Sequence, residues 1–228
     1  MRSTALSGVA LALLLPLAAC GSGDDEQGRS ATEVLAAAKE HFDSADSVHL
    51  TLATKSTPSS GDGVLGANGT LTHQPAFKGT VKVMLGGFNA DVPVVSVDGE
   101  VHAKLPMTVK YAVIDPADYG APDPAEFADP ERGISGLLLK LEGAEEHGEK
   151  RNGSQVLTTY AGTLLGSYVK PIIPSADAKG TYDTVVGVDQ DDRITTLKVT
   201  GDFFSGSEDE TFDMAFDDYD KAVTIEAP

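Results

Sequence analysis

Hydrophobic residues near the start of the chain recur with the period of an α-helix. Four of them fall on one face of residues 31–43, and Ser30 followed by Glu33 three positions later matches a capping box, which favours a helix beginning at this point. The pattern therefore predicts one amphipathic helix ahead of the rest of the fold. The four residues of its apolar face are Val34, Leu35, Ala38 and Phe42.

After this helix the hydrophobic period changes from 3.6 to 2, which is typical of half-buried strands. Asp98-Gly99 and Asn152-Gly153 each separate two alternating segments, and both dipeptides favour tight hairpin turns. Because hairpin spacing continues throughout, we predict an antiparallel sheet and an α+β fold. The segments with strand-like alternation are 48–53, 64–73, 77–85, 89–105, 144–151, 154–162, 179–188, 193–202, 210–217 and 222–226.

The middle of the chain differs, because aspartate directly precedes proline three times, at positions 115, 123 and 129. Each pair places a capping carboxylate before a proline at the first helical position, which favours a short helix. Helices are therefore predicted at 124–128 and 131–141. An apolar segment predicts a further short helix at 163–170.

The apolar run at the start of the chain is interpreted as a signal peptide. Residues 5–17 are too few to span a membrane, which takes roughly 20 residues, but they suit the apolar core of a signal peptide. The run ends in a lipobox-like Leu-Ala-Ala-Cys sequence, so we expect cleavage before Cys20 and acylation of its thiol. The alternative is an ordinary secretory signal with a chance cysteine, but the polar segment that follows suits a tether.

This interpretation divides the chain into three parts. Residues 1–19 are the signal peptide, 20–29 are a flexible tether, and 30–228 form a single domain. Two or three acyl chains anchor a protein stably, whereas one is marginal. The predicted location is therefore the extracytoplasmic face of the cell membrane, with the protein held there by the acyl chains on Cys20.

The chain is strongly acidic, with a formal net charge of −18 from 35 acidic and 17 basic residues. Nucleic acid is excluded as a natural partner, because phosphate contacts need clustered lysine and arginine. A body of this charge is also not expected to adhere to anionic lipid head groups, which leaves membrane attachment to the anchor. The single cysteine excludes an internal disulfide, so stability must come from packing.

Two short motifs resemble ligand-binding loops but lack the required context. Residues 61–66 have the glycine spacing of a dinucleotide-binding loop, yet a strand rather than a helix is predicted after them, which favours a flexible loop. Residues 189–192 resemble a calcium loop, but Ile194 and Thr200 stand where an EF-hand has glycine and glutamate. We therefore interpret residues 189–192 as a solvated hairpin turn.

The acidic end of the chain has two interpretations. Asp213 and Asp217 do not separate cleanly by strand period from Phe212 and Phe216, which indicates a bulge or a strand end. We prefer a solvated acidic face, with weak calcium binding as the alternative. None of the five histidines pairs at metal-ligand spacing, so no metal site and no cofactor is predicted.

No catalytic motif stands out in the sequence. Ser135, flanked by glycines at 133 and 136, comes nearest to a nucleophile elbow, but a small residue near a helix start explains it better. The prediction is a protein that is not an enzyme, with a hydrolase acting through Ser135 as a third hypothesis. The apolar faces of the strands and helices suit either a packed core or a lipid cavity, and periodicity does not separate the two.

Several segments, taken in order, resemble one known family. They are 47–52, 79–87, 95–103, the Asp-Pro segments at 123–125 and 129–134, the turn at 152–153, and 221–225. Together with the lipobox they resemble the LppX/LprAFG family of actinobacterial lipoproteins over nearly the whole mature chain. The sequence departs from the family pattern at 58–70 and 105–115.

The resemblance implies a strongly curved antiparallel β-sheet, a half-barrel, with helices on its concave face enclosing an apolar cavity. It also implies that the domain binds acylated lipids or lipoglycans and carries them between envelope layers. A membrane efflux transporter is implied as a partner, because some members are encoded with one. The residues that this picture places on the cavity walls are Val34, Leu35, Val48, Leu50, Val81, Val83, Leu85, Val101, Ala103, Leu105, Ile134, Leu137 and Leu138.

The alternative function is a non-catalytic surface interaction module. Its core would be filled by the same aliphatic side chains, and its acidic face would bind the partner. A structure without a cavity and a purified protein without lipid would favour this alternative.

Overall fold

The computed structural model describes residues 28–58, 63–204 and 209–228. The predicted signal peptide, Cys20, most of the predicted tether and the start of the glycine-rich motif at 61–66 lie outside these residues. Within them, no helix is both long enough and apolar enough to cross a membrane.

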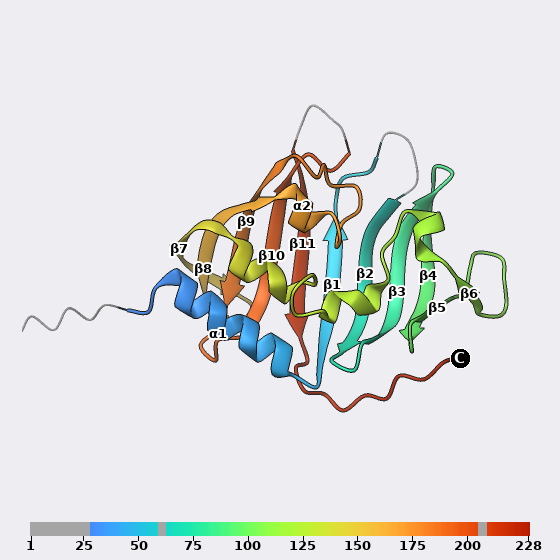
Figure 1. Ribbon diagram of the computed structural model, residues 1–228, viewed down its shortest axis with the longest axis horizontal. Coiled ribbons are helices and arrows are strands. Elements are labelled where there is room, and N and C mark those ends of the chain that lie inside the picture. The colour runs from blue at the N-terminus through green and yellow to red at the C-terminus, as the bar shows by residue number, and fades with distance from the viewer. Residues whose placement is uncertain (1–27, 59–62, 205–208) are drawn as a thin grey trace, which may run out of the picture.

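Eleven strands within the described residues form one sheet. They are β1 (Ser47–Thr54), β2 (Gly63–Thr72), β3 (Ala76–Leu85), β4 (Phe88–Val97), β5 (Glu100–Ala103), β6 (Ala112–Ile114), β7 (Glu142–Asn152), β8 (Gln155–Leu165), β9 (Thr181–Val188), β10 (Ile194–Gly201) and β11 (Glu210–Asp217). β1 lies in the middle, with β2 to β6 following in order on one side and β11 back to β7 on the other (Figure 1). Every pair of neighbours is antiparallel, and the sheet does not close, because β6 and β7 are its two edges.

Helices are few in the described part of the chain. α1 (Ala31–Ser44) is the one α-helix longer than a single turn, and it has the predicted capping box between Ser30 and Glu33. α2 (Gly166–Val169) is one turn, because β8 continues to Leu165 and takes up the first half of the predicted helix at 163–170. The Asp-Pro pairs at 115 and 123 begin two short 3-10 helices, η1 (Pro116–Tyr119) and η2 (Pro124–Ala128), each capped by its aspartate. The pair at 129 begins a turn, and a third 3-10 helix, η3 (Ser135–Lys140), follows it.

The helix predicted at 131–141 is shorter than expected and is not α-helical. η3 begins only at Ser135, and the preceding chain turns tightly against itself. A Cβ atom added at Gly136 would lie 2.3 Å from the carbonyl oxygen of Glu131, so the turn is closed to any larger residue. The apolar residues of this segment, Ile134, Leu137 and Leu138, which were predicted to line the cavity, are all buried.

The segment between the two edge strands crosses one face of the sheet. β6 and β7 are consecutive in sequence but lie at opposite edges, so residues 115–141 must travel the full width of the sheet (Figure 1). Along this path η2 contacts β2, β3 and β4, while η3 packs against α1, which in turn contacts β7 and β10. The crossing segment and α1 therefore share one face, which we call the inner face.

The two halves of the inner face are filled differently. On the side of β7 to β11, α1 packs tightly, and the ring of Phe42 contacts Phe216 and Tyr219 edge-on at centroid distances of 5.6 and 6.3 Å. Burial of the Tyr219 hydroxyl raises its pKa, and this hydroxyl donates a hydrogen bond to the carbonyl of Ile194 (2.7 Å). On the side of β2 to β6, the part of the crossing segment that carries the 3-10 helices η1 and η2 lies over the sheet.

The outer face of the sheet is polar and carries paired charges. Phe212 and Phe216 of β11 point inward and are buried, whereas Asp213 and Asp217 point outward in regular alternation. Asp217 pairs with His49 (2.7 Å) and Asp213 with Lys198 (2.6 Å) on the neighbouring strands. The predicted bulge is therefore wrong, because the strand keeps its period to its last residue. The alternative, a strand end, is found at Asp217.

Two further differences from the predicted strands have physical causes. Residues 222–226 form no strand, because β1 and β11 each have neighbours on both sides and offer no free edge to this tail. The tail is instead tied to β1 by the hydroxyl of Ser47, which donates to the carbonyl of Lys221 (2.7 Å). β6 was not predicted, because its three residues are too few to show a period.

Candidate functional site

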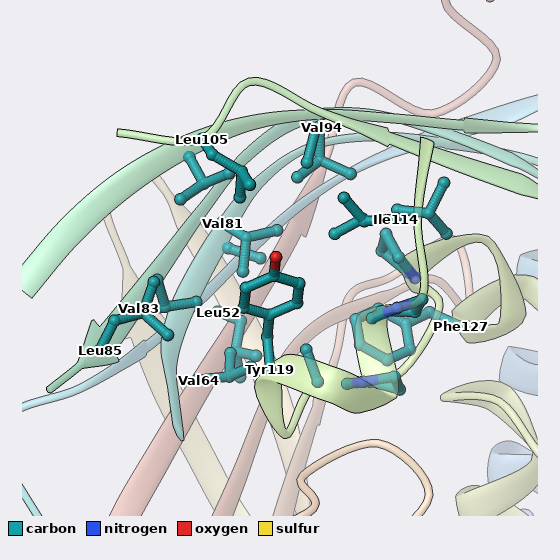
Figure 2. Close-up of a pocket in the computed structure, with 18 residues that line it drawn as sticks. Leu52, Val64, Val81, Val83, Leu85, Val94, Leu105, Ile114, Tyr119 and Phe127 are labelled. Carbon is teal, nitrogen blue, oxygen red and sulfur yellow. The ribbon is translucent and has the colours of Figure 1, made fainter. Parts of the chain in front are cut away.

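An apolar pocket lies between the inner face of β1 to β6 and the crossing segment (Figure 2). About 630 Å³ of space free of protein atoms, part of it open to solvent, lies between its walls. The centre of a water-sized sphere can move through only about 50 Å³ of this space, so the pocket is narrow as it stands. Its lining residues are Leu52, Val64, Ala67, Val81, Val83, Leu85, Val92, Val94, Val101, Ala103, Leu105, Ile114, Pro116, Tyr119, Ala121, Pro122, Pro124 and Phe127.

The sheet wall of the pocket follows from strand register. Leu52 on β1 lies opposite Ala67 on β2, which lies opposite Val81 on β3, and Val81 in turn lies opposite Val92 on β4. Residues opposite one another across an antiparallel pair point to the same face, so this row presents four apolar side chains to the inner face. A second row runs from Val94 to Ala103.

On β1 to β3 the pocket stops where two glycines face each other. Gly69 on β2 and Gly79 on β3 form the next row, and Cβ atoms added to them would lie 2.6 and 2.8 Å from Cζ of Phe77. The buried Phe77 ring therefore occupies the space that two side chains would otherwise fill. On β1 to β3, every residue that lines the pocket lies on the far side of this row from α1.

The roof of the pocket is formed by η1, η2 and the proline-rich link between them. Asp123 caps η2 by accepting a hydrogen bond from the backbone N–H of Ala125 (2.9 Å). The same carboxylate oxygen accepts a hydrogen bond from the hydroxyl of Ser96 on β4 (2.6 Å), and Ser96 is fully buried. Residues 122 and 124, on either side of Asp123, are both prolines that line the pocket. The carboxylate that caps η2 therefore also joins the roof of the pocket to the sheet.

Tyr119 at the end of η1 projects its ring into the pocket (Figure 2). Gly120 follows in the left-handed conformation (φ 64°), and its N–H donates to the carbonyl of Ala117 (3.1 Å), which ends the 3-10 helix and turns the chain. All other side chains that line the pocket are aliphatic, proline or phenylalanine, so the Tyr119 hydroxyl is the one polar side-chain atom on its walls. No aspartate, glutamate, histidine, lysine or arginine is among the lining residues.

The structure brings six of the predicted cavity residues together in this pocket and places seven elsewhere. Val81, Val83, Leu85, Val101, Ala103 and Leu105 line the pocket. Among the seven, Val48 and Leu50 lie on β1 at or beyond the Gly69 row. All seven are buried in the core beside α1 and η3 and do not line the pocket. They are Val34, Leu35, Val48, Leu50, Ile134, Leu137 and Leu138.

The sequence did not identify the other twelve lining residues. Those on strands, such as Leu52, Val92 and Val94, share the alternation used for the predicted set and could have been found from it. Those on the roof, such as Tyr119 and Phe127, show no alternation of hydrophobic and polar residues that would identify them. Their position in the pocket depends on the route by which the chain crosses the sheet.

Ser135 has a structural environment rather than that of a nucleophile. It is fully buried, and its hydroxyl donates to Oδ1 of Asp43 on α1 (2.5 Å). The other oxygen of Asp43 is paired with Lys39. This contact joins η3 to α1, and a fully buried hydroxyl has no access to a substrate.

The turn at 189–192 is held by the carboxylate of Asp189. This group accepts hydrogen bonds from the backbone N–H groups of Asp191 (3.0 Å) and Arg193 (2.9 Å). Asp192 binds the guanidinium of Arg29 through two hydrogen bonds of 2.6 and 2.7 Å, which hold the pKa of the Asp192 carboxyl below its usual range. Among the described residues, no group of three or more histidine, cysteine, aspartate and glutamate side chains is placed to hold a metal ion.

Within the described ranges these features define a class of fold: an open antiparallel sheet of eleven strands with few helices, whose edges are joined by a segment that crosses one face. The model of the LppX_LprAFG lipoprotein family matches residues 30–225. The chain belongs to this family of lipoproteins, which confirms the resemblance seen in the sequence.

Two solved structures share the fold. The crystal structure of LprF from Mycobacterium bovis matches with a TM-score of 0.70 at 16% sequence identity, covering 88% of this chain and 99% of that one. The crystal structure of Mycobacterium tuberculosis lipoprotein LppX matches with a TM-score of 0.64 at 17% identity, covering 86% of this chain and 98% of that one. No curated protein sequence matches this chain.

Proposed function

We propose that this chain is a non-enzymatic envelope lipoprotein that binds acylated lipids or lipoglycans in the apolar pocket and carries them between envelope layers. The observation that carries the proposal is the lining of the pocket, in which eighteen side chains offer a single polar atom, the hydroxyl of Tyr119. A pocket without charges has no means to orient a polar substrate, but it suits a hydrocarbon chain.

The energy of acyl-chain transfer is consistent with a carrier. Each buried methylene is worth roughly 0.8 kcal/mol, so a chain of about 16 carbons gains on the order of 10 kcal/mol on entering an apolar pocket. A bilayer offers the same chain a similar gain. Because the two environments are nearly balanced, cargo can be taken from a membrane and handed on.

The narrowness of the pocket sets a requirement for loading. Water-sized free space of about 50 Å³ is too little for a long acyl chain, so its walls must move apart as the chain enters. Within the roof, η1 is the part suited to this movement, since it has only four residues, lies outside the contact between Ser96 and Asp123, and ends at the half-buried Tyr119. We propose that the acyl chain displaces the Tyr119 ring and takes its place.

A substitution on the sheet wall tests the pocket directly. Val81→Trp places a large ring among the lining residues, and Lys82→Trp places the same ring one residue later on the exposed outer face of β3. We expect native mass spectrometry to find co-purified lipid on the original protein and on Lys82→Trp, and much less on Val81→Trp. Equal loading of both variants would contradict the pocket as the lipid site.

A second variant keeps the proposal testable if Val81→Trp does not fold. Tyr119→Ala removes the ring from the pocket without adding bulk, and we expect it to retain or increase the mass of bound lipid. If lipid is absent from the original protein and from Tyr119→Ala, the carrier proposal fails, and the surface interaction module with an acidic face becomes the better account.

The anchor and the location are part of the same proposal. We propose that residues 1–19 are removed, that Cys20 is acylated, and that residues 30–228 act as one lipid-binding domain at the extracytoplasmic face of the membrane. Growth of the host with labelled palmitate is expected to label the original protein but not Cys20→Ser. A membrane efflux transporter stays a predicted partner.

A further inference from the structure

The β5–β6 loop (residues 104–111) exposes apolar side chains that nothing in the described chain covers. Met107 is 104% exposed and Val109 is 86% exposed, and Val113 on the adjoining β6 is 58% exposed. Phe88, at the turn between β3 and β4, is 80% exposed. Single exposed apolar residues are common, but large ones grouped next to a pocket indicate a binding surface.

The loop is ordered, although it exposes these side chains. The N–H of Thr108 donates to the carbonyl of Leu105 (3.0 Å), and the Thr108 hydroxyl donates to the same carbonyl (2.7 Å). Lys104 continues the pairing with β4 through its N–H, which donates to the carbonyl of Pro93 (2.9 Å). Met107 is held at the tip with a positive φ of 64°, which residues other than glycine seldom adopt. The hydrogen-bonded loop therefore presents the Met107 side chain to solvent.

The loop differs in charge from the rest of the chain. The whole chain has a net charge of −18, yet residues 101–114 contain Lys104 and Lys110 and no aspartate or glutamate. Lys110 is exposed and Lys104 is half-buried. Apolar side chains flanked by lysines are the combination that binds the interface of an anionic bilayer, where the apolar groups enter the acyl region and the lysines meet the head groups.

The loop lies next to the pocket, because residues near both of its ends line the pocket. Leu105, the second residue of the loop, and Ile114, the last residue of the β6 strand that follows it, both line the pocket. Because β3 and β5 are each antiparallel to β4, the turn that carries Phe88 leaves the sheet at the same end as this loop. Leu85 and Leu105 at that end are half-buried, whereas Val94 and Ala103 farther in are buried, so the pocket wall becomes more exposed toward the loop.

We propose that the β5–β6 loop is a membrane-docking surface that inserts Met107 and Val109 into an anionic lipid bilayer, with Phe88 exposed at the same end of the sheet. In Figure 1 the loop projects from the edge of the sheet beside β6. Docking at this place sets the pocket against the bilayer, so that a lipid tail passes between them without crossing water. The docking itself requires no cargo in the pocket and so goes beyond the proposed carrier function.

The chain contains no tryptophan, which makes a single introduced indole a clean reporter. The full chain carrying Val109→Trp is mixed with vesicles of equal parts phosphatidylglycerol and phosphatidylcholine whose acyl chains carry bromine. Leu139→Trp, at an exposed apolar residue on η3 beside Lys140, is the matched control. We expect the emission of Val109→Trp to shift to the blue and to be quenched by bromine, and the emission of Leu139→Trp to change little.

The charge dependence is tested in the same assay. Adding Lys104→Glu and Lys110→Glu to the Val109→Trp chain is expected to weaken vesicle binding by at least about fivefold, as is replacing phosphatidylglycerol with phosphatidylcholine. Quenching of Val109→Trp no greater than that of Leu139→Trp would overturn the proposal. So would a shift that depends on protein concentration and not on vesicles, since the loop would then contact a second copy of the chain.

The same samples separate this proposal from the carrier function. Lipid bound to the protein is measured by mass spectrometry before vesicles are added. Bromine quenching with an empty pocket would support docking and contradict the carrier, whereas a loaded pocket without quenching would do the reverse.

Discussion

The hydroxyl of Ser96 on β4 donates a hydrogen bond to Oδ1 of Asp123, the residue that caps η2 (2.6 Å). Ser96 belongs to the sheet and Asp123 to the crossing segment, so this contact holds the roof of the pocket to its wall. The acceptor is a carboxylate, and the Ser96 side chain is fully buried. Hydrogen bonds to charged groups stabilise a fold more than hydrogen bonds between neutral groups.

Ser96→Ala is therefore expected to loosen the roof. Loss of a hydrogen bond to a charged group should lower the free energy of unfolding by about 1.5–3 kcal/mol, measured by urea denaturation. Ser44→Ala removes an exposed hydroxyl that bonds only a backbone carbonyl at 3.3 Å and serves as the control. Equal unfolding midpoints for the two variants would show that the Ser96 contact does not hold the roof.

Gly79→Ala tests the glycine row that ends the pocket. The new Cβ would lie 2.2 Å from the carbonyl oxygen of Asn68 and 2.8 Å from Cζ of Phe77, so backbone and ring must both shift. We expect destabilisation of about 2 kcal/mol or more, as in other overpacked cores.

The matched control for this substitution is Gly63→Ala at the start of β2. A Cβ at Gly63 would meet no atom within 4 Å, so the unfolding free energy should stay the same or rise by about 0.4–1 kcal/mol. Equal unfolding free energies of the two variants would show that a Cβ atom is tolerated at Gly79, and would contradict steric crowding at the row of Gly69 and Gly79.

Ser135→Ala separates a structural role from a catalytic one. Loss of the hydrogen bond to Asp43 should destabilise the contact between η3 and α1 by about 1–3 kcal/mol. Hydrolysis of acyl esters by the purified original protein is expected to stay at the background rate, and the variant should show the same rate. Turnover by the original protein that disappears in Ser135→Ala would establish the hydrolase hypothesis instead.

The free energy of unfolding is expected to depend on pH through the carboxyl group of Asp129. Its carboxylate accepts hydrogen bonds from the backbone N–H groups of Arg132 (2.8 Å) and Glu131 (2.9 Å), which lower the pKa of Asp129. A carboxyl whose pKa is lower in the folded state stabilises the fold fully above its unfolded pKa of about 3.9. That contribution is lost as the pH falls through the folded pKa.

Asp129→Ala should therefore cost about 1 kcal/mol of unfolding free energy at pH 7, and the difference from the original protein should shrink below about pH 4. Asp129→Asn keeps an acceptor but does not titrate, so its stability should change less between pH 7 and pH 3 than that of the original protein. A difference between the original protein and Asp129→Ala that persists unchanged at pH 3 would contradict this assignment.

The strands could be predicted from sequence because hairpins are local. Alternation and the turns at Asp98-Gly99 and Asn152-Gly153 locate β4, β5, β7 and β8 within a few residues. Pairing of β1 with β11 joins residues more than 150 positions apart, so no local sequence pattern predicts it. The capping box at Ser30 was likewise predictable, because all its contacts lie within four residues.

The extent of the pocket could not be predicted for a different reason. Leu50 and Leu52 share the same face of β1 and are both buried, yet only Leu52 lines the pocket. The difference is made by Phe77 on β3, whose ring covers the glycine row opposite Leu50. Alternation assigns a side chain to a face, but only packing across several strands decides whether the space before it is filled.

The central position of β1 and β11 also governs how the sheet can form. From β1 to β6, and again from β7 to β11, each strand pairs with the next strand in sequence, so each half can pair as it is synthesised. Their single seam joins the first strand to the last, so it closes only after residue 217 is available, and this late step bears the largest loop-closure entropy in the molecule. A chain cut short before β11 would leave β1 and β10 as two long unpaired edges, which are templates for aggregation.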